Sequence, residues 1–273
     1  GMAVERSLLA FNLGRLVVSD PQLLERRFPA SRPGRIDPSP CATARVTAQE
    51  LISKRVAAGS SANLTSFISL LAAELIDYQG RALAERYLTV LAPLIAREQE
   101  IVGNASGLSR TAALHLFRLM AYKDEYEVAR LHLGARFQTE IDHMVPNSYK
   151  KRYLLHPPVL KSLGLKRKIR LHPMIAHPAF RLLRTMRKTR GTPLDLFGLS
   201  EMRKLERQLV QEYCVLVSRI TSELTVKNLT AAERVLAAPS YIRGYEDVKR
   251  ASLAVYRAKR DGALRDFESL PII

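Results

Sequence analysis

The sequence predicts a mainly α fold, an irregular helical domain organised around one central buried helix over residues 109–133. Apolar residues recur through this stretch (SRTAALHLFRLMAYKDEYEVARLHL) at the three- and four-residue spacing of a helix. They form two stripes on roughly opposite sides, which is typical of a helix packed on both sides. Ser109 has the side chain of an N-cap, and Gly134 stands where a left-handed residue often ends a helix.

The N-terminal residues predict a separate helix followed by an arm. Residues 3–18 fit a short amphipathic helix with Leu9, Leu13 and Leu16 on one face. Five prolines and a glycine follow between positions 20 and 40, and proline removes hydrogen-bond donors and fixes φ. We therefore expect an extended arm there rather than a core element.

The main domain is expected to begin at a capping box. Glu50 follows Thr47 by three residues, so each side chain can bond to the backbone N–H of the other at a helix start. We accordingly divide the chain into residues 1–46, an N-terminal helix with a proline-rich arm, and residues 47–273, a helical domain.

Further helices are predicted by the same periodicity and by local caps. Pro93 is expected to kink the helix over 81–102 or to divide it. The other predicted helices are 174–189, 201–224 and 245–267, and Ser200 is the expected cap of the second. A further short helix is expected to start at a capping box formed by Thr230 and Glu233 and to end at 238. A short β-ribbon near 150–172, around Tyr153–Leu155 and Ile169–Leu171, interrupts the helices.

Composition limits the classes of function. With 273 residues, 47% of them hydrophobic and 25% charged, the chain can bury a sizeable core. Its apolar runs are shorter than the roughly 18 residues that cross a bilayer, the N-terminus lacks a signal-peptide pattern, and Cys41 and Cys214 are far apart. We expect a cytoplasmic protein with reduced thiols and no membrane partner.

Motifs for common cofactors and metals are missing from the sequence. It contains neither a glycine-rich dinucleotide or P-loop motif nor a CxxC pair. His143, His156, His172 and His177 lie in a basic segment that would repel a cation, so we interpret them as residues that shape turns and bond to the backbone. The sequence therefore predicts no catalytic, cofactor-binding or metal-ligating residue.

Acidic and aromatic residues gather near the end of the central stretch. An acid–base site in a free-standing hydrolase or transferase would use Asp124, Glu125 or a histidine, and it would need an apolar cleft. We favour a structural polar cluster in which Asp124 is buried and held by an arginine of another helix, while Lys123 and Glu127 pair one turn apart. The cluster comprises Tyr122, Lys123, Asp124, Glu125, Tyr126, Glu127 and Arg130.

The net charge of +17 is concentrated in one segment. No acidic residue occurs between Asp142 and Asp195, whereas Lys and Arg occur thirteen times there. Three interpretations are open: the solvated face of a helix, a nucleic-acid surface that lacks aromatic stacking platforms, and a docking surface for an acidic protein. The candidate anion- or partner-binding residues are Lys166, Arg167, Lys168, Arg170, Arg184, Arg187, Lys188 and Arg190.

Several segments share their sequence and order with one enzyme family. They are AFNLGRLVVSD (10–20), DYQGRALAERY (77–87), LMAYKDEYEVARL (119–131), LLHPPVL (154–160), RLLRTMRKTRGTPLDLFG (181–198), ERQLVQEYCVLV (206–217) and IRGYEDVK (242–249). Together they resemble the C-terminal helical region of indolepyruvate ferredoxin oxidoreductases, which are thiamine-diphosphate-dependent 2-oxoacid:ferredoxin oxidoreductases. The first segment resembles the closing helix of that family's gamma domain, so residues 1–46 would be the tail of a gamma-type domain.

The resemblance implies a reaction in which an aryl pyruvate is oxidatively decarboxylated to an acyl-CoA and electrons pass to ferredoxin. It also implies thiamine diphosphate, Mg²⁺ and iron–sulfur clusters in the assembly. This chain lacks the diphosphate–Mg²⁺ motif and the cluster cysteines, so those cofactors are expected in other domains or subunits. We expect a module that supports assembly or docking and is not catalytic alone, with residues 150–190 contacting acidic ferredoxin or the phosphates of coenzyme A. A basic helical module that binds nucleic acid is the alternative.

Overall fold

The computed structural model of the chain describes residues 2–19, 40–56, 60–144, 152–155, 169–195, 197–244 and 246–270. The chain divides into two compact units, Gly1–Pro38 and Ser39–Ile273. The first unit contains α1 (Met2–Ser19), where the sequence predicts a short helix. The predicted arm, apart from Pro40, and the side chains of Leu9, Leu13 and Leu16 lie outside the described residues.

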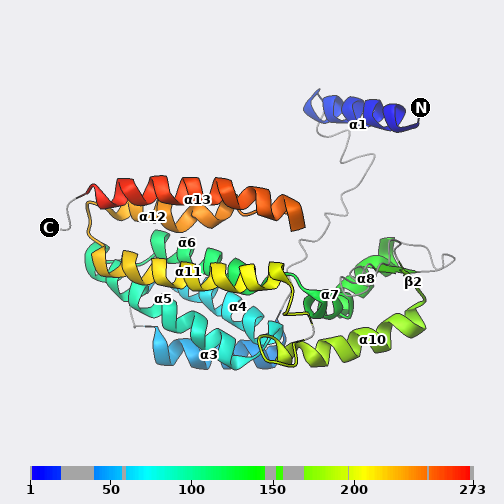
Figure 1. Ribbon diagram of the computed structural model, residues 1–273, viewed down its shortest axis with the longest axis horizontal. Helices are drawn as coiled ribbons and strands as arrows, with labels where there is room; N and C mark the ends of the chain where they lie inside the picture. The colour runs from blue at the N-terminus through cyan, green and yellow to red at the C-terminus, as the bar shows by residue number, and fades with distance from the viewer. Residues whose placement is uncertain are drawn as a thin grey trace. The chain divides into compact units, whose positions relative to one another are not determined.

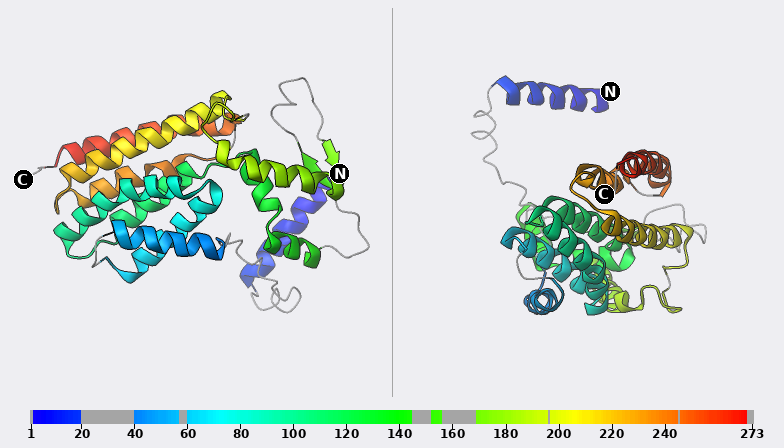
Figure 2. Two further views of the ribbon diagram at one scale, coloured as in Figure 1. Left: turned by 90° about the horizontal axis from the view of Figure 1, so that it is seen from below. Right: turned by 90° about the vertical axis from the view of Figure 1, so that its left-hand side faces the viewer.

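A helical bundle forms the main part of the second unit, and the predicted mainly α class is confirmed (Figure 1). Its helices are α3 (Ala42–Arg55), α4 (Ala62–Tyr78), α5 (Arg81–Val102), α6 (Gly107–Met120), α11 (Glu201–Glu223), α12 (Leu229–Ala237) and α13 (Glu246–Glu268). Tyr87, Leu91, Ile95, Leu116 and Val217 are fully buried in one core that α5, α6 and α11 share. The views in Figure 2 place α13 against α12, on the side of the bundle away from α3.

The α5 helix follows the predicted range of 81–102 at both ends. It buries residues at three- and four-residue spacing, from Ala84 through Leu88 to Glu98. It continues through Pro93 as one element rather than starting again there, and it ends at Gly103, whose φ of 78° is left-handed.

The predicted central helix over 109–133 is wrong as a single element. The chain forms α6 up to Met120 and then a separate helix, α7 (Glu125–His132). Asp124 is extended, with φ −113° and ψ −176°, and its carboxylate accepts a hydrogen bond of 2.8 Å from the Glu127 N–H. Asp124 is therefore the N-cap of a new helix, and this local cap ends the continuity that the apolar periodicity predicts.

Several predicted helix ends are also wrong. Ser109 is buried inside α6 rather than at its N-cap, and Gly134 has no positive φ. Thr47 lies within α3, where its hydroxyl donates to the Thr43 carbonyl, so α3 crosses the expected boundary between residues 46 and 47. Asn228 rather than Thr230 precedes α12, because the Asn228 side chain holds the preceding turn by bonding to Thr225 and Glu223.

The remaining predicted elements are confirmed. Ser200 caps α11, and its side chain accepts from the Arg203 N–H. The predicted helix 174–189 forms as α10 (Pro173–Met186) followed by the 3-10 turn η1 (Arg187–Thr189), and a second such turn, η2 (Ala238–Tyr241), follows α12. The ribbon consists of β1 (Tyr153–Leu155) paired antiparallel with β2 (Ile169–Leu171).

A smaller lobe extends from one end of the bundle in Figures 1 and 2. It contains α7, α8 (Ala135–Met144), the ribbon and α10, and α8 was not predicted from the sequence. Its own core consists of Ala129, Ala176 and Phe180, with Tyr153 and Leu171 of the ribbon packed against them. The lobe is therefore a separate packing centre that presents α10 on the surface.

Among the described helices, none combines the length and the apolar composition that a membrane crossing requires.

Candidate functional site

Among the described residues, the most buried ion pair joins Asp124 to Arg190. The Arg190 Nε and Nη2 atoms donate to the two carboxylate oxygens at 2.6 and 2.7 Å, and both side chains are nearly withdrawn from solvent. Arg190 also donates to the Tyr78 carbonyl and stacks 3.7 Å from the centre of the Tyr78 ring. Arg190 is thus neutralised inside the protein, which corrects its prediction as an anion-binding residue. Asp124 is likewise occupied by its partners rather than facing an apolar cleft.

A second buried carboxylate fixes the loop that follows η1. Asp195 accepts hydrogen bonds from the backbone N–H groups of Gly191 and Gly198, at 2.9 and 3.0 Å, and from the Tyr126 hydroxyl at 3.2 Å. The Tyr126 ring meets Phe197 edge-on, with centroids 5.1 Å apart. The loop is therefore held against α7 through Tyr126, which contacts both Asp195 and Phe197.

Glu127 pairs with Arg130, three residues further along α7. The Arg130 guanidinium donates to both Glu127 oxygens at 2.8 Å and lies 3.5 Å from the carboxylate of Glu74 on α4. Burial raises the pKa of Glu74 to about 7, although Arg130 opposes that rise. The backbone of Lys123 also takes part in the cluster, because its carbonyl accepts a hydrogen bond from Arg203.

Arg203 connects the remaining residues of the predicted polar cluster to α11. It lies 3.7 Å from the Glu125 carboxylate, pairs with Glu206 at 2.5 Å, and stands over the Tyr122 ring at 5.2 Å. Burial raises the pKa of Glu125. The predicted cluster is thus brought together, and its charged groups face one another across α4, α7 and α11.

The candidate functional site is a cationic groove at the C-terminal end of α10. We call this feature the cationic groove. It has a volume of about 350 Å³ and is lined by Arg181, Arg184, Thr185, Arg187 and Lys188. Within the described parts of the chain, none of its four cations forms an ion pair with a carboxylate. Burial and the neighbouring Arg184 lower the pKa of Arg187. The nearby Asp77 carboxylate partly opposes that lowering. The groove is therefore a surface lined by four cations without a direct carboxylate partner among the described residues.

The groove contains three of the residues predicted to bind anions, Arg184, Arg187 and Lys188. Arg170 is exposed on β2, and Lys166, Arg167 and Lys168 lie outside the described residues. Sequence reasoning missed Arg181 as a member. The signal was present, since positions 181, 184, 185 and 188 follow the three- and four-residue spacing of one helical face.

An apolar stripe adjoins the groove on α10. Met174, Ile175 and Leu182 are 79%, 63% and 64% exposed, and we call them the outer stripe. They lie away from the buried Ala176 and Phe180, which anchor the helix to the lobe. The outer stripe is the exposed apolar side of a rigidly held helix.

The histidines of the basic segment have structural contacts where they are described. The His172 ring accepts from the Met174 N–H at 3.3 Å at the start of α10, and the His177 ring lies 2.9 Å from the Tyr153 hydroxyl. The His143 side chain and His156 lie outside the described residues. Among the side chains that are described, no group of three or more His, Cys, Asp or Glu residues could hold a metal.

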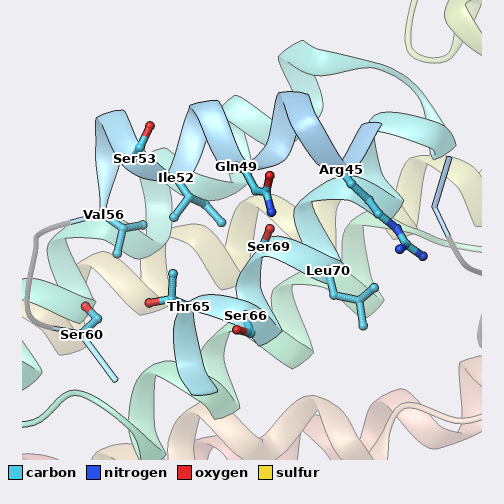
Figure 3. Close-up of a pocket in the computed structure, with 10 residues that line it drawn as sticks. All are labelled: Arg45, Gln49, Ile52, Ser53, Val56, Ser60, Thr65, Ser66, Ser69 and Leu70. Carbon is cyan, nitrogen blue, oxygen red and sulfur yellow. The ribbon is translucent and has the colours of Figure 1, made fainter. Parts of the chain in front are cut away.

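A larger groove of about 700 Å³ separates α3 from α4 (Figure 3). Gln49 of α3 and Ser69 of α4 point toward one another across it, and Ile52 forms part of its apolar floor. The described residues that line it are Arg45, Gln49, Ile52, Ser53, Val56, Ser60, Thr65, Ser66, Ser69 and Leu70. Apart from the Arg45 guanidinium, these residues offer neutral hydrogen-bonding groups, and none of them is a carboxylate, histidine or cysteine. The described lining therefore lacks the usual groups of an acid–base site.

The profile of a family of unknown function (DUF6537) matches residues 64–262. That range contains the buried ion pairs, the cationic groove and the outer stripe. No curated protein and no solved structure matches the chain.

Proposed function

This chain belongs to the DUF6537 family, and we propose that it is the C-terminal helical module of a 2-oxoacid:ferredoxin oxidoreductase of the indolepyruvate type. In that role it supports assembly or docking while an aryl pyruvate is decarboxylated to an acyl-CoA elsewhere. Thiamine diphosphate, Mg²⁺ and the iron–sulfur clusters belong to other domains or subunits, because this sequence lacks the motifs that would hold them.

One observation carries the assignment to a supporting module. The segments that resemble the oxidoreductase family supply the buried network: Tyr78 comes from 77–87, Asp124 from 119–131, and Arg190 from 181–198. These residues bond to one another rather than facing a substrate cleft. The shared motifs therefore explain how a helical module is held together, which favours a structural role over a catalytic one.

The outer stripe is the surface on which we place the contact with the rest of the oxidoreductase. Three large apolar side chains remain exposed on a helix whose other side is anchored in the lobe. Burying each of these side chains in an interface would contribute about 1.5–3 kcal/mol to the free energy of association. A module of a fused or multisubunit enzyme needs such a surface, and its occupant here is another polypeptide of the same oxidoreductase.

A capture experiment tests this proposal. The tagged chain is incubated with extract of its source cell at low and moderate salt, and bound polypeptides are identified by mass spectrometry. We expect thiamine-diphosphate-binding and iron–sulfur polypeptides, and we expect Met174→Ser/Leu182→Ser to reduce their recovery.

The matched control is Val215→Ser/Val255→Ser, which removes two exposed apolar residues of α11 and α13 and should leave capture unchanged. Equal recovery with both double variants would reject the outer stripe as the contact. Recovery of nucleic acid alone, lost as salt rises, would instead support the alternative function.

A further inference from the structure

We propose that the cationic groove binds a small polyphosphate anion of the pyrophosphate class. The groove lies beside the outer stripe on α10, and this inference is independent of the proposed role in an oxidoreductase. It is carried by the charge balance around the groove, by one buried donor without an acceptor, and by the rigidity of the surrounding backbone.

The charge balance differs between the groove and the residues next to it. Arg130 is neutralised by Glu127, and Arg190 by Asp124. The groove residues Arg181, Arg184, Arg187 and Lys188 have no carboxylate partner among the described residues. Like charges gathered on one short surface repel one another, and a multiply charged anion would offset that repulsion.

Arg187 supplies a second, independent observation. Its side chain lines the groove, and its Nε atom is buried without a hydrogen-bond acceptor in the described structure. A buried donor that lacks an acceptor is costly, so native proteins nearly always supply one. The planar fork of the guanidinium suits oxyanions, so the part of the Arg187 side chain that lines the groove is a suitable donor for the oxygen atoms of a bound phosphate group.

The backbone that carries the groove is preorganised. The Arg190 N–H donates to the Arg187 carbonyl, and the Thr189 hydroxyl donates to the Met186 carbonyl at 2.8 Å. Arg190 is in turn fixed to Asp124. Arg187 and Lys188 therefore project from a restrained turn, and Arg181 and Arg184 project from α10. A restrained backbone lowers the entropy lost when a ligand binds.

The groove lining favours a small anion over a macromolecule. Its volume of about 350 Å³ falls at the lower end of small-ligand pockets. None of the described lining residues is aromatic, so they offer no platform on which a nucleic-acid base could stack. None is a large apolar residue either, whereas the centre of a protein interface is apolar.

Calorimetric titration of the full chain with pyrophosphate at constant ionic strength tests the inference. Arg184→Gln/Lys188→Gln changes two exposed cations and should weaken pyrophosphate binding by about tenfold or more, since each charge-assisted hydrogen bond is strong. The matched control, Arg250→Gln/Arg257→Gln, removes the same charge from the exposed side of α13 and should change binding by less than about twofold. Arg187→Lys should also weaken binding, because it removes the fork while keeping the charge.

Three outcomes would overturn the inference. The first is equal weakening in both double variants, which would assign binding to net charge. The second is pyrophosphate binding no tighter than sulfate binding under the same conditions. The third is failure to bind pyrophosphate while duplex DNA or an acidic ferredoxin is retained by the groove cations. Because Met174→Ser/Leu182→Ser leaves the groove intact, the two proposals can fail separately. Unchanged capture by this variant, with normal pyrophosphate binding, would reject the outer stripe as the contact and leave this inference standing.

Discussion

The carboxylate of Asp124 and the guanidinium of Arg190 form two hydrogen bonds of 2.6 and 2.7 Å, although 66 residues separate them in the sequence. The pair joins the start of α7 to the end of η1. It therefore determines where the second helix begins and where the turn beneath the cationic groove is held.

Removing either member of this pair should be strongly destabilising. Asp124→Ala leaves a buried guanidinium without its counter-charge, and we expect a loss of about 3–5 kcal/mol in the free energy of unfolding. Urea denaturation measures it. The double variant Asp124→Ala/Arg190→Met should lose less stability than the sum of the losses in the two single variants. Arg81→Gln, which breaks an exposed pair with Glu85, is the control and should leave the urea midpoint unchanged. An unchanged midpoint for Asp124→Ala would contradict this prediction.

Glu98 should be a major determinant of the start of α6. Its carboxylate accepts from the N–H groups of Leu108 and Ser109, at 3.0 and 2.9 Å, and from the Ser109 hydroxyl at 2.5 Å. Glu98→Ala leaves these buried donors unpaired, so we expect a loss of about 2–3 kcal/mol in urea denaturation. Ser109→Ala removes only the hydroxyl contact and should cost about 1 kcal/mol. Equal losses in the two variants would show that the backbone contacts contribute little.

Glu74 should make stability fall as pH rises through the neutral range. Its pKa is about 7 in the folded chain, because burial disfavours the carboxylate, against 4.5 as its ordinary value. Between these values the folded state holds the proton more often than the unfolded state, so deprotonation costs stability. We expect wild type to lose about 2 kcal/mol more than Glu74→Gln between pH 5 and pH 7.5, measured by urea denaturation. Identical pH profiles would refute the raised pKa.

His115 should act in the opposite direction at acidic pH. Burial, and to a smaller extent Arg118, lowers its pKa to about 4, and its Nδ1 atom has no hydrogen-bond partner in the described structure. Between pH 6.5 and 4 the unfolded state binds a proton that the folded state does not, so stability falls as pH falls. At pH 5 this effect amounts to about 2 kcal/mol, and His115→Gln should remove it from the unfolding profile. A variant that follows the wild-type profile from pH 7 to 5 would exclude His115 as the cause.

Elements with a strong local signal could be predicted from the sequence. The α5 helix has a sustained apolar period, and the Ser200 side chain caps α11 without help from distant residues. Helix ends that depend on tertiary contacts could not be predicted. Ser109 looks like an N-cap, yet its hydroxyl bonds to Glu98 of the preceding helix. Asp124 fits an apolar helical face by spacing, yet it caps α7 because Arg190 stabilises it there.

The same distinction applies to the candidate site. The run without acidic residues between Asp142 and Asp195 identifies where positive charge gathers, because charge is a local property of the sequence. This run does not tell which of the cations remain available to bind a ligand. Arg187 and Arg190 are three residues apart, yet one lines the groove and the other is neutralised by a carboxylate far away in the sequence. Only the packing of α7 against the turn after α10 separates them.

The antiparallel ribbon also affects how freely the chain can change in length. Leu155 pairs with Ile169, so the connection through residues 156–168 leaves and returns at neighbouring points. The entropy of closing such a connection grows only logarithmically, and doubling its length costs about 0.6 kcal/mol. The pairing of Leu155 with Ile169 therefore keeps the two ends of this connection together, whatever the length of chain between them.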